Sequence, residues 1–133
     1  MYLLDSNTCI QFLNGRSADV ERRLAGTTPS KVKICSVVKA ELFYGAARSK
    51  NHTATRARLE TFFAPYESIP FDDAAAVEYG RIRGHLAEAG TPIGPNDLLI
   101  AAIGLSRRLT LVTHNTREFS RVPGLVVEDW EMP

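Results

Sequence analysis

The amino-acid sequence predicts an α/β protein, a three-layer α/β/α sandwich around a central, mainly parallel sheet. Short apolar runs with strand character alternate with longer stretches in which apolar residues recur at helical spacing, a pattern typical of consecutive βαβ units. The 133 residues contain no repeat, low-complexity tract or linker. We therefore expect a single domain over residues 1–133, with a ligand site at the carboxyl ends of its strands.

Capping and helix-ending residues divide the first half of the chain. Ser6 and Ser36 are suited to cap helices at their N-termini, and Gly15 and Gly26 are suited to end them. The expected elements are a strand at 2–5, a helix from Ser6 to about Asn14, a short helix over Asp19–Leu24, a strand over Val32–Cys35, a long helix that Ser36 caps, and an amphipathic helix over 52–64.

The second half continues the same alternation. Asp72 or Asp73 starts a helix that stops at Gly90. The helix predicted over 96–107 is apolar nearly all round, as buried helices are. The expected strands lie over Ser68–Pro70, Leu109–Thr113 and Leu125–Glu128.

The composition is that of a globular protein, with 44% hydrophobic and 23% charged residues. No apolar stretch is long enough to span a bilayer, and the N-terminus lacks the basic region of a signal peptide. Cys9 and Cys35 are too few for a disulfide scaffold, so we expect buried thiols. These observations predict a cytoplasmic protein with no membrane partner.

The net charge of +1 is not the strongly basic balance of a typical nucleic-acid binder. Basic residues nevertheless cluster at 48–58, 81–83 and 107–108. They form either a basic rim around an acidic pocket or a set of solvated helix faces, and the sequence leaves both interpretations open.

Acidic and amide residues stand where strands end or helices begin. Asp5 ends the first strand, Glu41 lies in the helix after the second, Asp97 starts helix 96–107, and Asn115 follows strand Leu109–Thr113. In a parallel sheet these places are neighbours, because the carboxyl ends of the strands share one edge. Taken singly, each acid has a simpler explanation as a helix cap, a helix-dipole partner or a solvated residue.

A shared acidic pocket favours a divalent cation. Two carboxylates about 4 Å apart repel by about 4 kcal/mol at an effective dielectric constant near 20, so a cation is needed to keep them all ionised. Oxygen ligands without a His or Cys cluster indicate Mg²⁺ or Mn²⁺ rather than zinc. Such an ion can polarise a phosphodiester and lower the pKa of an attacking water. The pattern therefore predicts phosphodiester hydrolysis.

Longer motifs resemble a known family, the PIN-domain ribonucleases of the VapC type, which are the toxin halves of bacterial toxin–antitoxin pairs. The matching segments run in family order over nearly the whole chain: LLDSNTCI at 3–10, SVVKAELFYGA at 36–46, GTPIGPNDLLIAA at 90–102 and LVTHNTREFSRVPGLVVEDW at 111–130. The resemblance implies an endoribonuclease, dependent on Mg²⁺ or Mn²⁺, that cleaves structured RNA, often tRNA at the anticodon loop. It also implies a small VapB-type antitoxin partner and a homodimer.

Asp5, Glu41 and Asp97 match the metal-binding acids of this family. Many PIN domains have an Asp where this chain has Asn115, and Glu118 follows three residues later. The fourth position stays open between them; we favour Asn115 as the site residue, with Glu118 as its electrostatic support. The resemblance implies supporting or phosphate contacts for three further polar residues, Ser6, Asn7 and Thr113.

Other interpretations are weaker or stay open. Asn7 stands where haloacid-dehalogenase-like phosphatases need a second Asp, which disfavours that reaction. His114 has no Cys partner at ligand spacing, which disfavours zinc. Tyr44, Phe43 and Trp130 could stack on RNA bases, although core packing or a subunit contact is the commoner role of such residues. An inactive RNA-binding module and a housekeeping RNA-processing nuclease are the alternatives to a toxin.

Overall fold

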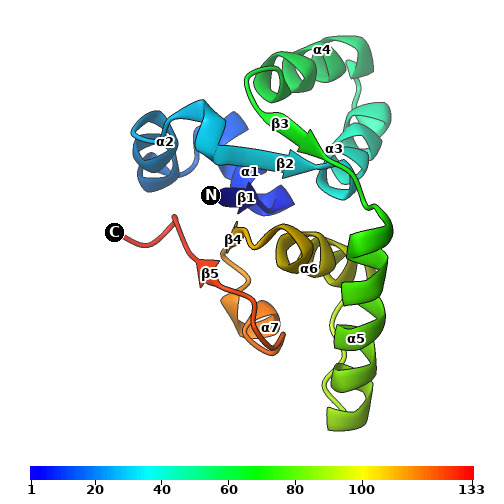
Figure 1. The fold of residues 1–133 in the computed structure, drawn as a ribbon. Helices are drawn as coiled ribbons and strands as arrows, with labels where there is room; N and C mark the ends of the chain where they lie inside the picture. The colour runs from blue at the N-terminus through cyan, green and yellow to red at the C-terminus, as the bar shows by residue number, and fades with distance from the viewer.

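A five-stranded sheet with the order β3-β2-β1-β4-β5 forms the centre of the computed structural model, which describes residues 1–133 (Figure 1). Every pair of neighbouring strands is parallel, so the predicted α/β class is confirmed and the sheet is parallel throughout. The strands are β1 (Tyr2–Leu4), β2 (Val32–Cys35), β3 (Glu67–Ile69), β4 (Thr110–Val112) and β5 (Val127–Glu128).

Helices connect all consecutive strands and form the outer layers of an α/β/α sandwich. Figure 1 shows the long helix α5 beside α6, and α7 beside β5, in agreement with the contacts between these elements. The helices are α1 (Ser6–Leu13), α2 (Ala18–Ala25), α3 (Ser36–Arg48), α4 (His52–Phe63), α5 (Asp73–Ala89), α6 (Pro95–Arg107) and α7 (Thr116–Phe119), with a 3₁₀ turn, η1 (Pro29–Lys31).

The strand order creates a switch point beside β1. The chain moves from β1 to β2 and β3 on one side, then crosses back to β4 on the other side of β1. In open α/β sheets ligands bind in the crevice at the carboxyl ends of the strands, where the order reverses. Helix α6 precedes β4 and runs against it, so its first turn lies at the same edge. The fold thus gathers the ends of β1 and β4 and the start of α6.

The core is apolar and centred on the sheet and α6. Leu3 and Leu111, on neighbouring strands, are fully buried, as is the segment Ile100–Gly104 of α6. A Cβ atom at Gly104 would lie 3.7 Å from Leu3 and 3.4 Å from Leu125, so the glycine allows α6 to approach the sheet closely. The predicted burial of helix 96–107 is confirmed.

Two predicted N-caps are wrong by one residue. The N-cap of α1 is Asp5 and not Ser6. Asp5 has an extended backbone, and its carboxylate accepts a hydrogen bond from the Ser6 N–H. The cap position of α3 is held by Cys35 without a side-chain hydrogen bond, while the Ser36 hydroxyl donates to the carbonyl of Ile69. In both cases the helix starts directly at the end of the strand, with no intervening turn for a serine to occupy.

Short elements account for the other differences. The strand predicted over Ser68–Pro70 lies one residue earlier, and the strands predicted over Leu109–Thr113 and Leu125–Glu128 are shorter than expected. Neither η1 nor α7 was predicted, because elements this short show no apolar periodicity. Cys9 and Cys35 are buried free thiols, as expected. None of the helices is long and apolar enough to cross a bilayer.

Candidate functional site

Asp5 is buried at the end of β1, where its two carboxylate oxygens accept different hydrogen bonds. One oxygen accepts from the backbone N–H of Ser6 at 2.8 Å, and the other accepts from the hydroxyl of Thr113 at 2.7 Å. The Asp5 N–H donates to Val112 of β4 at 2.9 Å. Thr113 is fully buried and its hydroxyl also accepts from the N–H of Asn115. The carboxylate is therefore fixed from the start of α1 and from the segment that follows β4.

Glu41 reaches the same place from α3. Its carboxylate accepts a hydrogen bond of 2.7 Å from the hydroxyl of Ser6. Ser6 therefore connects the two acids directly, since its N–H donates to Asp5 and its hydroxyl donates to Glu41. Because Asp5 caps α1, the Ser6 hydroxyl is free to make this longer-range contact.

The third acid, Asp97, lies in the first turn of α6 and meets α7. The carboxyl group of Glu118 lies close enough to that of Asp97 to raise its pKa through hydrogen bonding and charge. Asn115 donates from its side-chain amide to Glu118 at 2.6 Å. Glu118 is thus the acid that completes a cluster with Asp5, Glu41 and Asp97, hereafter the acidic pocket, and Asn115 holds it in place.

Burial, with a further contribution from neighbouring negative charges, raises the pKa values of two of these acids. For Asp97 the pKa rises to about 7, first because of burial, then because of the charge of Asp5, the hydrogen bond and charge of Glu118, and the charge of Glu41. For Asp5, burial raises the pKa most, the hydrogen bonds from Thr113 and Ser6 lower it, and the charge of Glu41 raises it. The pocket therefore holds acids whose negative charges repel one another.

The donor set of the pocket fits a hard divalent cation. It offers carboxylate oxygens only, whereas zinc sites commonly include His or Cys. The acids are not drawn together to direct-ligand spacing, because no three of them have ligand atoms within 4.8 Å of one another. That spacing suits Mg²⁺, which usually keeps several waters and takes only one or two carboxylates directly.

Two of the predicted polar residues differ in their placement. Thr113 supports Asp5 as described, whereas Asn7 is exposed and makes no side-chain hydrogen bond. His114 points to the C-terminal segment, where its Nδ1 lies 2.9 Å from Asp129 and 3.8 Å from Glu131. Among the His, Cys, Asp and Glu residues, these three form the only group of three whose potential ligand atoms lie within 4.8 Å of one another.

Sequence reasoning missed one buried polar residue near the pocket and the partner of His114. The hydroxyl of Thr8 donates to the carbonyl of Val112 at 3.2 Å and so joins α1 to β4. Asp129 pairs with His114 from across the end of the sheet. Both residues lie inside the segments that resemble VapC proteins, but their contacts depend on the strand order, which those segments do not show.

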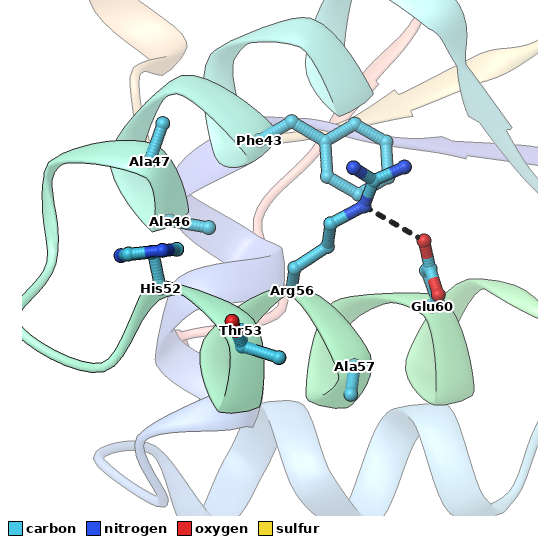
Figure 2. A pocket seen from close by; sticks show the side chains of 8 residues that line it. All are labelled: Phe43, Ala46, Ala47, His52, Thr53, Arg56, Ala57 and Glu60. Atoms are coloured by element: carbon cyan, nitrogen blue, oxygen red, sulfur yellow. Dashed lines mark hydrogen bonds and ion pairs between the residues drawn. The ribbon is translucent and has the colours of Figure 1, made fainter.

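A second hollow, of about 590 Å³, lies between α3 and α4 and is lined by none of the pocket acids (Figure 2). Arg56 lies along this hollow, with its guanidinium 5.8 Å from the centre of the Phe43 ring and a hydrogen bond of 3.0 Å to Glu60. A narrower groove of about 210 Å³ between α1, α3 and α4 reaches the pocket, because Glu41 lines it.

Comparison with known proteins identifies the family. The family model described as PIN domain matches residues 2–125. The chain belongs to the PIN-domain family. Among curated relatives, it is 40% identical to the tRNA(fMet)-specific endonuclease VapC of Salmonella typhimurium and 42% identical to that of Shigella flexneri, in each case over 97% of both chains. It is 36% identical to ribonuclease VapC2 of Rickettsia felis over 98% of both chains.

Solved structures of VapC proteins share this fold. The DNA-bound VapBC complex of Salmonella typhimurium contains a chain that matches with a TM-score of 0.91 and 40% identity, over 97% of each chain. The VapBC2 complex of Rickettsia felis, bound to a promoter fragment, matches with a TM-score of 0.88 and 35% identity, over 97% of this chain and 98% of that one. The resemblance to VapC-type PIN domains is confirmed.

Proposed function

We propose that this VapC-type PIN domain, working as a single domain over residues 1–133, is a metal-dependent endoribonuclease and the toxin of a toxin–antitoxin pair. The acidic pocket at the switch point carries this proposal, because acids so placed would share a divalent cation. The names of the Salmonella and Shigella relatives support initiator tRNA, tRNA(fMet), as the substrate. A toxin with this substrate would act in the cytoplasm.

A bound Mg²⁺ or Mn²⁺ would polarise the scissile phosphodiester and lower the pKa of an attacking water. We assign Asp5, Glu41 and Asp97 to hold the ion. Thr113 and Ser6 orient two of these carboxylates through the hydrogen bonds already described, in the way that outer contacts usually fix metal ligands.

We assign Glu118 as the fourth acid and Asn115 as the residue that positions it. The carboxyl contact between Glu118 and Asp97 supports this assignment. Asn115 offers a neutral amide, and that amide already donates to Glu118. The assignment reverses the preference that PIN-domain position alone would give to Asn115.

Cleavage of a tRNA(fMet) transcript in Mg²⁺, and in EDTA, tests the proposed function. We expect a single cleaved bond that requires the metal, and loss of most cleavage in Asp5→Ala, Glu41→Ala and Asp97→Ala. Glu88→Ala, which removes an exposed acid of α5, is the matched control and should cleave normally. Cleavage that persists in EDTA, or near-normal rates in two of the three pocket variants, would contradict the proposal. A folded protein that cleaves no RNA would instead indicate an inactive module.

A VapB-type antitoxin is the proposed partner, and the toxin itself is proposed to be a homodimer. The groove between α1, α3 and α4 suits an antitoxin segment, since it is half apolar and ends at Glu41. Gly45 lines this groove, and a Cβ atom there would contact nothing within 4 Å. Gly45→Glu should therefore weaken antitoxin binding and leave RNA cleavage intact. Unchanged binding would place the antitoxin elsewhere. A gene for a small antitoxin beside this one would distinguish a toxin from a housekeeping nuclease.

A further inference from the structure

Tyr44 is a large aromatic residue left exposed beside the acidic pocket. Its side chain is on the surface, with 64% of the residue accessible to solvent. The other aromatic candidates for base stacking are occupied: Trp130 is 1% exposed, and the ring of Phe43 packs at 5.5 Å against Phe63. Exposure on this scale is not explained by core packing, so the Tyr44 ring is available to a ligand.

The ring of Tyr44 borders a shallow depression that includes the pocket acid Glu41. Tyr44 follows Glu41 by three residues, so both lie on one face of α3. The depression has a volume of about 580 Å³, and its lining includes Leu99 of α6. Asn96, which precedes Asp97 in the chain, also lines the depression and is exposed. A molecule seated here would be next to the scissile phosphate of a bound RNA.

A positive charge accompanies the ring. The guanidinium of Arg48 lies 5.5 Å from the centre of the Tyr44 ring, one helical turn beyond it. Arg48 makes no ion pair, whereas Arg56, Arg81 and Arg107 each pair with an acid. Arg48 contacts the ring but does not line the depression, which Tyr44 shares with Glu41.

We propose that Tyr44 is a base-stacking platform that receives an unpaired nucleotide next to the scissile bond, with Arg48 near the RNA backbone and the Asn96 amide at the edge of the base. This inference rests on the proposed ribonuclease function. An aromatic face with a nearby arginine is a common means of holding single-stranded RNA, and an amide has both a donor and an acceptor for a base edge. The occupant is a loop nucleotide, because a base inside a helix has no free face.

The test is a double-mutant cycle between Tyr44 and single bases of the substrate. The probe is a tRNA(fMet) transcript in which abasic nucleotides replace, one at a time, those flanking the cleaved bond. We expect Tyr44→Ala to lower kcat/KM roughly tenfold or more, and Tyr44→Trp to restore cleavage. One abasic position should cause a similar loss in the wild type and no further loss in Tyr44→Ala.

Tyr79→Ala provides the matched control. Tyr79 and Arg83 form a Tyr–Arg pair with the same four-residue spacing on α5, and the guanidinium lies 5.7 Å from the ring centre. Tyr79 is half-buried against Phe71 and accepts a hydrogen bond from Arg83, and it lines no depression with a pocket acid. This control should leave the abasic pattern unchanged.

Four results would overturn the proposal. If the wild type cleaves normally and Tyr44→Ala cleaves equally well, the stacking role alone is contradicted. Independent losses from Tyr44→Ala and from every abasic position would contradict it in the same way. A change in sedimentation between wild type and Tyr44→Ala would assign this face to a second copy of the chain. A folded wild type that cleaves no RNA would contradict the proposed function and this inference together.

Discussion

Asp5 shows how one carboxylate serves the fold and the proposed chemistry at once. Its bond to the Ser6 N–H caps α1, and its bond from Thr113 ties β1 to the segment after β4. Both hydrogen bonds favour the ionised form, yet burial and the charge of Glu41 together leave the pKa raised. Asp5 can therefore serve both as the cap of α1 and as a proposed metal ligand, because the hydrogen bonds that make it a cap also hold its carboxylate at the pocket.

Substitutions at Glu118 and Asn115 should differ in their effect on the metal. Glu118→Gln removes a charge beside Asp97, so we expect the Mn²⁺ concentration for half-maximal cleavage to rise by about tenfold. Asn115→Ala removes only the donor that positions Glu118, and we expect a smaller rise. Metal titrations of tRNA cleavage by both variants make the comparison. Equal midpoints in wild type and Glu118→Gln would exclude Glu118 from the ion.

The raised pKa of Asp97 predicts that the metal-free protein loses stability as the pH rises. The folded protein keeps a proton on Asp97 up to about pH 7, whereas the ordinary value is 3.8. Between these values the folded state binds more protons than the unfolded chain, so the free energy of unfolding falls with increasing pH. In EDTA, the wild type should have a lower melting temperature at about pH 8 than at about pH 5.

Asp97→Asn should reduce this dependence on pH, since it removes the titrating group. Thermal unfolding of both proteins in EDTA across the pH range is the measurement. A wild type that becomes more stable over the whole range would mean that Asp97 ionises at its ordinary pKa in the folded protein.

At the scale of elements, the ends of the helices place the site. Asp97 reaches the pocket because α6 starts at the carboxyl edge of the sheet, immediately after the Gly94–Pro95 turn. Helix α5 must stop at the right residue for the chain to reach that turn. Gly90 ends it in the left-handed region, with φ of 69°.

Two glycines of the same helix region should therefore respond oppositely to alanine. At Gly90 a Cβ atom would contact nothing within 4 Å, so Gly90→Ala should cost roughly 1 kcal/mol through backbone strain alone. Gly80 lies inside α5, also in open space, so Gly80→Ala should stabilise by roughly 0.5–1 kcal/mol. Thermal or urea unfolding measures both. If Gly90→Ala is as stable as the wild type, the helix does not need a left-handed residue there.

Element ends also explain which site residues the sequence could reveal. Asp5 and Asp97 stand at the ends of a strongly patterned strand and helix, and Glu41 lies inside the long helix that follows β2. Their convergence was therefore expected from the alternation of strands and helices. The pairing of Asn115 with Glu118 depends on α7, which spans only Thr116–Phe119. A helix of this length has no periodicity to detect. The choice between Asn115 and Glu118 for the fourth position therefore depends on the three-dimensional structure.

At the scale of the whole molecule, the sequence predicted the layers but not the order of the strands. Alternating strands and helices predict a parallel sheet, and the resemblance to VapC narrowed this to a PIN domain. Neither the alternation nor the resemblance identifies the contact of Thr8 with Val112 or that of His114 with Asp129. The first joins residues 104 positions apart, and the second joins residues 15 positions apart. Such contacts depend on strand order, which short buried strands do not encode locally.

The pocket acids are proposed to form one cation site, and thermal unfolding of wild type and Asp97→Asn measures whether they do. Near pH 8 in EDTA, the variant should be more stable by about 1 kcal/mol, or about 3–5 °C, because relief of repulsion at a half-buried carboxylate is reduced by solvent screening. In millimolar Mn²⁺ the wild type should gain more, because binding to the folded state stabilises it by mass action. A variant less stable than wild type in EDTA, with an equal gain from Mn²⁺, would contradict the claim and identify Asp97 as a partner of the α6 dipole.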